Sequence, residues 1–300
     1  MLWGIGLISL MASAVVIAER FRIKAAGNIV ENARAESLAE AGINRVRLQL
    51  VQAVLRGSTE SPQIRGDGQP LICAMPGRAL AALAIDDEGG KVDLNAAPLA
   101  LLSRLLRGFG ANAAEADALA QAIADFTHPA GNAVLDDVLL HDYERDGRPY
   151  GPKRTLFDTV FELDQVKGMR TDLLRRLIPY VTVHSHKPGV DPVKAAPVLL
   201  AALGGRSPFA VVANEDLTSR RREALAHDVP AFFWVQSSGR SFLVHAEVRT
   251  ADGGRAVREA IIDLTLGDPP DVMREWRSGA SRFQALLDSA AGRSDGVPPC

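Results

Sequence analysis

The first 55 residues constrain this chain more than any other stretch, because an uncharged apolar run continues into an amphipathic helical pattern without a clear break. Residues 1–18 contain no charged side chain. Eighteen helical residues span about 27 Å, slightly less than the ~30 Å hydrocarbon thickness of a bilayer. Further on, Ile43, Val46, Leu50 and Val54 recur at helical spacing. The sequence therefore predicts one helix of about 50 residues, with its first half in a membrane and its second half outside.

Two other interpretations compete for the apolar run. A cleavable secretory signal carries basic residues before its apolar core, whereas this run begins at Met1 with nothing basic ahead of it. A buried core helix is the second alternative. Glu19 to Arg22 directly follow the run, which fits the edge of a membrane better. Both alternatives stay open, and we favour the membrane anchor.

Composition places the chain among globular proteins. Its 300 residues are 47% hydrophobic and 23% charged, which is ample for a packed core and for more than one domain. The net charge of −2 lacks the basic excess of a nucleic-acid surface. Two cysteines, Cys73 and Cys300, exclude a disulfide framework and a four-thiolate zinc site within the chain. A bridge between them is allowed in an oxidising compartment, but Cys300 ends a Gly/Pro-rich tail, and we predict two free thiols.

Short strands are expected before residue 90, and a helical pattern begins at residue 91. Helix starts are indicated by Asn112 with Glu115 and by Thr159 with Glu162, the spacing of a capping box. Leucine-rich faces follow these signals. The sequence predicts a compact helical domain over residues 91–183.

A weak internal repeat extends the helical region. Residues 92–98 (VDLNAAP) are echoed by residues 190–197 (VDPVKAAP), and two adjacent leucines follow each copy. We expect a second, shorter helical unit over residues 184–228. Its Arg220-Arg221-Arg222 run is interpreted as a solvated helix face.

After Pro230 the periodicity becomes two, which predicts an antiparallel meander. Its three expected strands are residues 231–236, 241–250 and 255–266. Residues 272–276 are expected to add an edge strand. In the middle strand, Val244 and its apolar partners alternate with a row that includes His245 and Glu247. We expect the first helix to cover the Val244 face and water to cover the other.

Candidate metal ligands are few. The densest acidic cluster lies in a region that we predict to be a loop. It contains Asp125, Asp136, Asp137, Asp142, Glu144 and Asp146. Such carboxylates suit calcium, but solvated loop acids are the favoured interpretation. His184 and His186 point to one face without a third ligand for zinc. No phosphate-cradling loop and no pairing of nucleophile with base occurs, so we predict no catalytic residue, no metal or cofactor ligand and no enzyme.

Residues 161–178 allow a different function. Two short helical stretches joined around Gly168 resemble a helix-hairpin-helix, a module that grips nucleic-acid backbone through hairpin amides. Arg170 stands where such hairpins usually have a second glycine, and the region lacks a basic face. A membrane-tethered helix-hairpin-helix nucleic-acid binder is therefore the alternative hypothesis.

Four segments together resemble the minor pseudopilin K family of type II secretion, also called general secretion pathway protein K. They are residues 33–42 (ARAESLAEAG), 90–95 (GKVDLN) with Ala97, 161–169 (FELDQVKGM) and 177–183 (LIPYVTV). Their order and spacing match the family to about Arg277, which is more specific than any single motif.

The resemblance implies a pilin-like α+β fold: a long N-terminal helix packed on an antiparallel sheet, with a large all-helical domain inserted between strands. It implies a structural role at the tip of a pseudopilus, single-pass in the bacterial inner membrane with the C-terminal domain in the periplasm, in protein secretion across the outer membrane. The implied partners are the minor pseudopilins I and J, the major pseudopilin, the inner-membrane assembly platform and, if a leader precedes Met1, prepilin peptidase.

The sequence departs from the family at two points. Family members begin with a basic leader ending in glycine, and here the first residues already belong to the apolar run, so we expect the natural start to lie upstream. Members that bind calcium carry Asp-Trp-Ile-Asp and Asn-Gly-Ala-Glu-Asp runs, where this chain has residues 125–128 (DFTH) and 136–140 (DDVLL). Leu139 and Leu140 cannot be side-chain ligands.

The predicted organisation is a series of six segments. They are a membrane-anchoring helix at 1–58, the first strands of the sheet at 59–90, the inserted helical domain at 91–183, the second helical unit at 184–228, the C-terminal meander at 229–278 and a flexible tail at 279–300.

Overall fold

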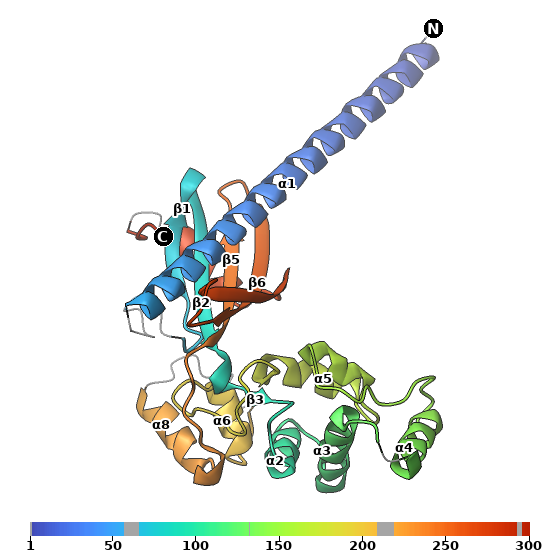
Figure 1. Cartoon of the computed structure of the whole chain (residues 1–300). Helices are drawn as coiled ribbons and strands as arrows, with labels where there is room; N and C mark the ends of the chain where they lie inside the picture. Colours follow the sequence, from blue (N-terminus) through green and yellow to red (C-terminus); the bar gives the residue numbers. More distant parts are fainter. Residues whose placement is uncertain (1, 57–65, 132, 209–218, 293–295) are drawn as a thin grey trace. The chain divides into compact units, whose positions relative to one another are not determined.

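The computed structural model describes residues 2–56, 66–131, 133–208, 219–292 and 296–300. The chain forms two compact units (Figure 1). Unit 1 is made by residues 1–65, 69–85 and 243–300, and unit 2 by residues 66–68 and 86–242. Unit 2 is thus inserted into the chain of unit 1. The predicted α+β fold class is confirmed, with a long N-terminal helix on an antiparallel sheet and helices in the insertion.

Unit 1 begins with α1 (Leu2–Leu55), a single helix of 54 residues. No proline occurs before Pro62, so nothing in this range removes a helical hydrogen bond. The expected helix end at Gly57 and Ser58 lies outside the described residues. Among the residues that the structure describes, none of the helices combines the length and the apolar character that crossing a bilayer requires.

The second half of α1 packs on the sheet of unit 1 through small and apolar side chains (Figure 1). Ala35, Ala39, Ile43 and Val46 are fully buried, at the three- and four-residue spacing of one helix face. Gly42 allows a close approach, because a Cβ there would lie 2.8 Å from Leu83 Cδ2. The expected packing of the helix on the sheet is confirmed.

The sheet has five strands in the order β1-β2-β5-β6-β7. They are β1 (Leu71–Met75), β2 (Ala79–Asp87), β5 (Ser241–Arg249), β6 (Arg255–Leu264) and β7 (Asp271–Ser278). β1 pairs antiparallel with β2, and β6 pairs antiparallel with β7 through a register shift after Ile261. β7 confirms the expected edge strand.

One expected strand is absent from this sheet. Residues 231–236 contain the 3₁₀ turn η5 (Ala231–Phe233), and Trp234 forms an isolated parallel bridge with Val190 in unit 2. The aromatic run looked like a strand because both strands and buried turns use large apolar residues. The prediction of a strand at 231–236 is wrong.

The face of the sheet opposite α1 is covered by the chain after β7. The short helix α9 (Gln284–Ala291) buries Leu287, and the Glu247 carboxylate accepts hydrogen bonds from Ser281 Oγ at 2.6 Å and from the Arg282 and Phe283 amides at 2.9 Å. The whole of β5 up to Val248 is buried as a result. The prediction of a solvated face is wrong, because the hydrogen bonds to Glu247 come from the segment after β7 and not from water.

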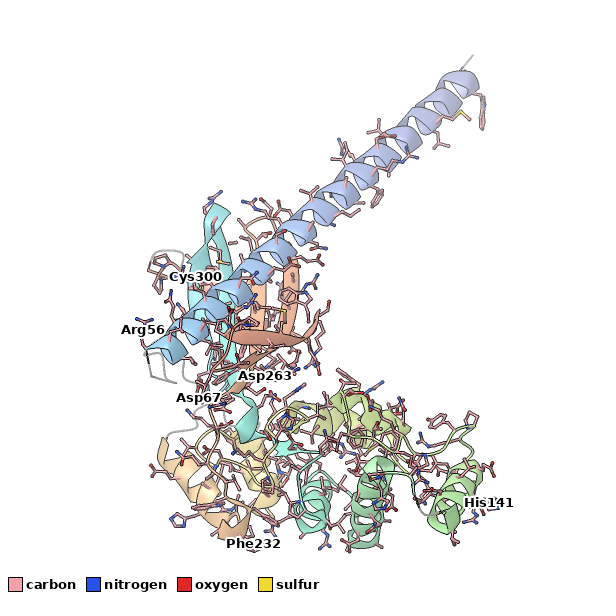
Figure 2. All side chains as sticks on the ribbon, in the orientation of Figure 1. Arg56, Asp67, His141, Phe232, Asp263 and Cys300 are labelled. Atoms are coloured by element: carbon pink, nitrogen blue, oxygen red, sulfur yellow. A yellow bond between two sulfur atoms is a disulfide. The ribbon has the colours of Figure 1, made fainter. Side chains whose placement is uncertain are left out.

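The C-terminus is also ordered. Pro299 bridges Ala74 of β1 in parallel, and Cys300 forms a disulfide with Cys73 (Figure 2). The backbone pairing brings the last residue beside the central residue of β1, 227 positions earlier in the chain. The prediction of two free thiols, and that of a flexible tail at 279–300, are therefore wrong for the described residues.

Unit 2 is mostly helical. Its helices are α2 (Leu99–Gly108), α3 (Ala113–Thr127), α4 (Ala133–Arg145), α5 (Thr171–Leu177), α6 (Pro197–Leu203) and α8 (Ser219–Asp228). The 3₁₀ turns η3 (Val160–Gln165) and η4 (Ile178–Tyr180) flank α5. Two short parallel strands, β3 (Val92–Asp93) and β4 (Val181–Thr182), pair with each other.

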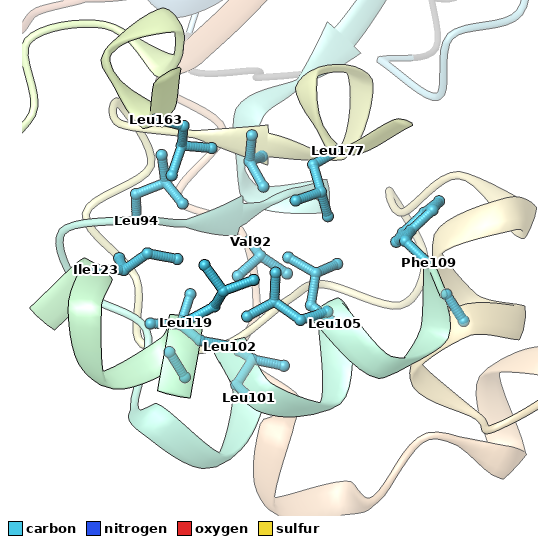
Figure 3. Close-up of a cluster of buried hydrophobic side chains, with 14 of the residues drawn as sticks. Val92, Leu94, Leu101, Leu102, Leu105, Phe109, Leu119, Ile123, Leu163 and Leu177 are labelled. Carbon is cyan, nitrogen blue, oxygen red and sulfur yellow. The ribbon is translucent and has the colours of Figure 1, made fainter. Parts of the chain in front are cut away.

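A single hydrophobic core runs through unit 2 (Figure 3). It joins Leu101 and Leu105 of α2 with Leu119 of α3, Leu177 of α5 and Leu199 of α6. The core therefore includes both stretches that the sequence divided at residue 183.

The predicted helix starts have different outcomes. Asn112 and Glu115 form the capping box at α3, with the Asn112 side chain accepting from the Glu115 amide at 3.0 Å. Thr159 makes no side-chain cap, and the segment after it is the 3₁₀ turn η3. The second capping box is wrong because too few residues follow it to form an α-helix.

The two copies of the internal repeat form the same turn, which an aspartate closes before a helix. Asp93 accepts the amide of Asn95 at 2.8 Å, and Asp191 accepts that of Val193 at 2.9 Å. In each copy the backbone carbonyl of the same aspartate also accepts from the residue four positions later, and a helix follows. The second carboxylate oxygen of Asp191 accepts the Ser237 amide at 2.8 Å, which fixes the turn to a distant segment.

Candidate functional site

The acidic cluster lies mostly on a helix and is paired with basic residues. Asp136, Asp137, Asp142 and Glu144 belong to α4, which corrects the expected loop. Arg154 contacts Asp136 at 2.9 Å, and Lys167 contacts Asp142 at 2.8 Å. The hydrogen bond from Lys167, helped by the charge of Arg145, lowers the pKa of Asp142. These pairs neutralise carboxylates that a cation would need.

Three of the remaining acidic candidates also have partners. Asp125 lies in the last turn of α3 and accepts from Gln121 at 2.8 Å, Asp146 contacts Arg148 at 2.9 Å, and Glu144 lies 3.3 Å from His141. Among the described residues, no group of three His, Cys, Asp or Glu side chains is arranged to hold a metal ion.

The two candidate histidines lie in the turn after β4. The His186 amide donates to Asp93 at 2.8 Å, and the His184 amide donates to Thr182 Oγ1 at 3.0 Å. These bonds use backbone groups to close the turn beside the repeat. The spacing of His184 and His186 is therefore explained by the fold of this turn.

The predicted helix-hairpin-helix is present in outline, but its amides are used inside the protein. Gly168 has a φ of 78° and donates its N–H to Asp146 Oδ2 at 3.2 Å, and Lys167 donates its N–H to the Tyr143 hydroxyl at 3.3 Å. Arg170 pairs with Glu115 at 2.6 Å. A phosphate group would have to displace the Asp146 carboxylate from the Gly168 amide and the Tyr143 hydroxyl from the Lys167 amide. The geometry therefore argues against the nucleic-acid hypothesis. The Arg220-Arg221-Arg222 run lies in α8, and its side chains are outside the described residues.

The first half of α1 exposes large apolar side chains. Phe21, Ile23 and Ile29 are each 70% exposed, and Val30 is 64% exposed. Ile23 and Val30 are seven positions apart and share one face of the helix, and we call these two residues the exposed α1 surface. Apolar side chains exposed together on one helix face indicate a site that binds other proteins or lipid. It lies on the helix that the sequence identified, N-terminal to the part that packs on the sheet.

A buried polar cluster was missed from the sequence. His245 is fully buried on β5, and its Nδ1 lies 3.0 Å from Glu259 on β6. Burial raises the pKa of Glu259, but the hydrogen bond from His245 and the charge of Arg277 outweigh it and lower this pKa to about 2. Burial likewise opposes the donors at Glu247, whose pKa is lowered by the hydrogen bonds from Ser281, Phe283 and Arg282. In the alternating pattern of residues 241–250, the polar row that contains His245 and Glu247 is the same as that of a solvent-exposed face. The sequence therefore did not indicate that this cluster is buried.

One family model matches part of the chain. The family model described as type II secretion system protein K matches residues 79–186. Over these residues the chain is similar to the type II secretion protein K family. The resemblance stated from the sequence is confirmed, and the family is a component of a secretion system.

The fold has a counterpart among solved structures. The chain is 16% identical to one in the crystal structure of the GspK-GspI-GspJ complex from the enterotoxigenic Escherichia coli type II secretion system. The TM-score is 0.53, and the match covers 88% of this chain and 100% of that one. A comparison with curated proteins finds no match. At this identity the structural likeness shows the fold.

Proposed function

We propose that this chain is a structural minor pseudopilin of the protein K type, at the tip of a type II secretion pseudopilus. The exposed α1 surface carries the proposal, because it is an apolar helix surface that the chain's own sheet leaves uncovered. Pilin-type filaments assemble by packing such helices together. The related structure is a complex with GspI and GspJ, and we propose the corresponding minor pseudopilins as partners here.

The tip position follows from the size of the insertion. A filament of identical contacts continues only if each head leaves room for the next subunit. Unit 2 spans residues 86–242 and is as large as an ordinary domain. A head enlarged in this way suits a terminal position, from which it would take part in protein secretion across the outer membrane.

Membrane anchoring belongs to the same proposal and rests on the uncharged sequence of residues 1–18. We place the anchor in the bacterial inner membrane and the C-terminal units in the periplasm. The Cys73–Cys300 disulfide supports an oxidising compartment. The major pseudopilin, the assembly platform and, if a leader precedes Met1, prepilin peptidase are the further proposed partners.

A charge on the exposed α1 surface tests the partner role. Val30→Arg should abolish co-purification of I-type and J-type pseudopilins, because a guanidinium would be desolvated between packed helices. Asn28→Arg is the matched control, since it adds the same charge to an exposed position on the opposite side of the helix. Equal recovery of both partners with the two variants would contradict the proposal.

We further propose that the subunit needs no calcium, because three of its candidate carboxylates, Asp136, Asp142 and Asp146, already have basic partners. Millimolar calcium should leave the melting temperature almost unchanged, since only a ligand that binds the folded state raises it. A rise of several degrees, lost in Asp136→Asn, would show that the acidic residues form a site.

A further inference from the structure

We propose that unit 2 carries a binding cleft for an acidic peptide segment of a partner protein. The cleft lies between α2, α3 and α6 and has a volume of about 950 Å³. This volume is at the upper end of the range for small-molecule sites, ~300–1,000 Å³, and is enough for several peptide side chains. The inference does not depend on the proposed place in a pseudopilus.

The cleft is shaped by close helix packing. Ala100, Ala120, Ala202 and Gly205 are among its lining residues, and they are too small to fill it. At Gly108 a Cβ would come within 2.8 Å of the Ala202 backbone, so α2 and α6 can approach each other only with glycine there. The apolar side of the cleft includes Phe232, which is 78% exposed (Figure 2). An aromatic ring held open to solvent beside a cleft is a typical anchor for a ligand side chain.

The charge of the cleft is positive. Its lining contains the three guanidinium groups of Arg104, Arg107 and Arg206, against the single carboxylate of Asp117. Arg107 contacts Asp117 at 2.7 Å, and Arg206 pairs with Asp228. Hydrogen bonds from Ser103 and then Arg107 lower the pKa of Asp117, which therefore stays ionised and neutralises Arg107.

Arg104 is the remaining positive charge. Its Nε donates to the backbone carbonyl of Leu203, which orients the guanidinium without neutralising it. Its Nη2 reaches to 3.7 Å from the position of a Cβ on Gly205. Within the described part of the chain, no carboxylate lies at ion-pair distance from Arg104. An oriented guanidinium of this kind suits a carboxylate, which it can bind through two parallel hydrogen bonds.

These features favour an acidic peptide over the other anionic macromolecules. Nucleic acid is recognised through a track of several uncompensated basic residues, whereas this cleft offers one such residue beside apolar lining. A peptide that alternates acidic and apolar side chains matches both Arg104 and Phe232.

The test uses the full chain in detergent and a short fluorescein-labelled peptide that alternates glutamate with leucine and phenylalanine. Fluorescence anisotropy should show saturable binding that weakens as salt rises from about 0.05 to 0.5 M. Arg104→Glu should reduce the affinity by about tenfold or more. Arg175→Glu is the matched control, because Arg175 is an exposed arginine of α5 outside the cleft, and it should bind as the unaltered protein does.

Two further measurements keep the result decisive. Phe232→Ala, which changes a side chain that is 78% exposed, should weaken binding several-fold. This variant covers the case in which Arg104→Glu fails to fold. The same peptide with glutamine for glutamate should bind at least about tenfold more weakly. No binding, equal binding of the glutamine peptide, an equal loss in Arg175→Glu, or tighter binding of a thymidine oligonucleotide would each overturn the proposal. Co-purification with I-type and J-type pseudopilins is scored separately, and it should be unchanged in Arg104→Glu.

Discussion

The two faces of the sheet in unit 1 are covered by different chemistry. On one face, α1 places Ala39, Ile43 and Val46 against the strands, so the contact is apolar and depends on shape. On the other, the segment before α9 places backbone amides on the Glu247 carboxylate, so the contact is polar and depends on hydrogen bonds. A buried apolar face shows in a sequence as a periodic pattern, whereas a buried polar face has the pattern of an exposed one.

The first prediction removes apolar contact alone. Ile43→Ala should lower the free energy of unfolding of unit 1 by about 2–5 kcal/mol, because Ile43 is fully buried and its removal leaves a cavity. Leu48→Ala is the control, since Leu48 lies on the same helix and is 57% exposed; it should change stability by less than about 0.5 kcal/mol. Denaturant unfolding measures both. Equal losses would mean that α1 does not bury the face described.

The second prediction concerns the pH dependence of stability that the polar face causes through Glu259. The pKa of Glu259 is lowered from 4.5 to about 2, so the ionised carboxylate stabilises the folded state above pH 4.5. This contribution, on the order of 2–3 kcal/mol, should be lost as the pH falls from about 4.5 to 2. Glu259→Gln should remove most of that pH dependence in thermal melts. An unaltered acid transition in the variant would show that Glu259 is not held by His245 and Arg277.

The third prediction separates the two faces. Glu247→Ala removes the acceptor of three hydrogen bonds and should cost about 1–3 kcal/mol. Its effect should be local: amide exchange should quicken across α9, while protection along α1 is retained. Glu40→Ala, which removes a half-exposed carboxylate 3.8 Å from Arg258, is the control. Faster exchange in α1 as well would show that the two faces are coupled.

Prediction from sequence was successful where local patterns determine the structure. The helix spacing of Ile43 and Val46, the capping box at Asn112 and the repeat at Asp93 and Asp191 are all present. Each depends on residues close together in the chain.

The sequence could not show contacts between distant residues that have no periodic pattern. The Cys73–Cys300 bridge depends on backbone pairing across 227 positions, and the satisfaction of Glu247 depends on a segment 34 to 36 residues away. Neither the composition nor the periodicity of those segments indicates the pairing. The cleft in unit 2 likewise draws its residues from helices far apart in the chain, and the Arg104–Leu203 contact beside it spans 99 positions.

The most direct test of the account is the copy number of this subunit in isolated pseudopili. Quantitative mass spectrometry of sheared pseudopili should find it in a fixed ratio of about one to each of the I-type and J-type pseudopilins, and far below the major pseudopilin, because under the proposed tip position the inserted unit 2 blocks the next subunit. A copy number comparable to that of the major pseudopilin would contradict the tip assignment.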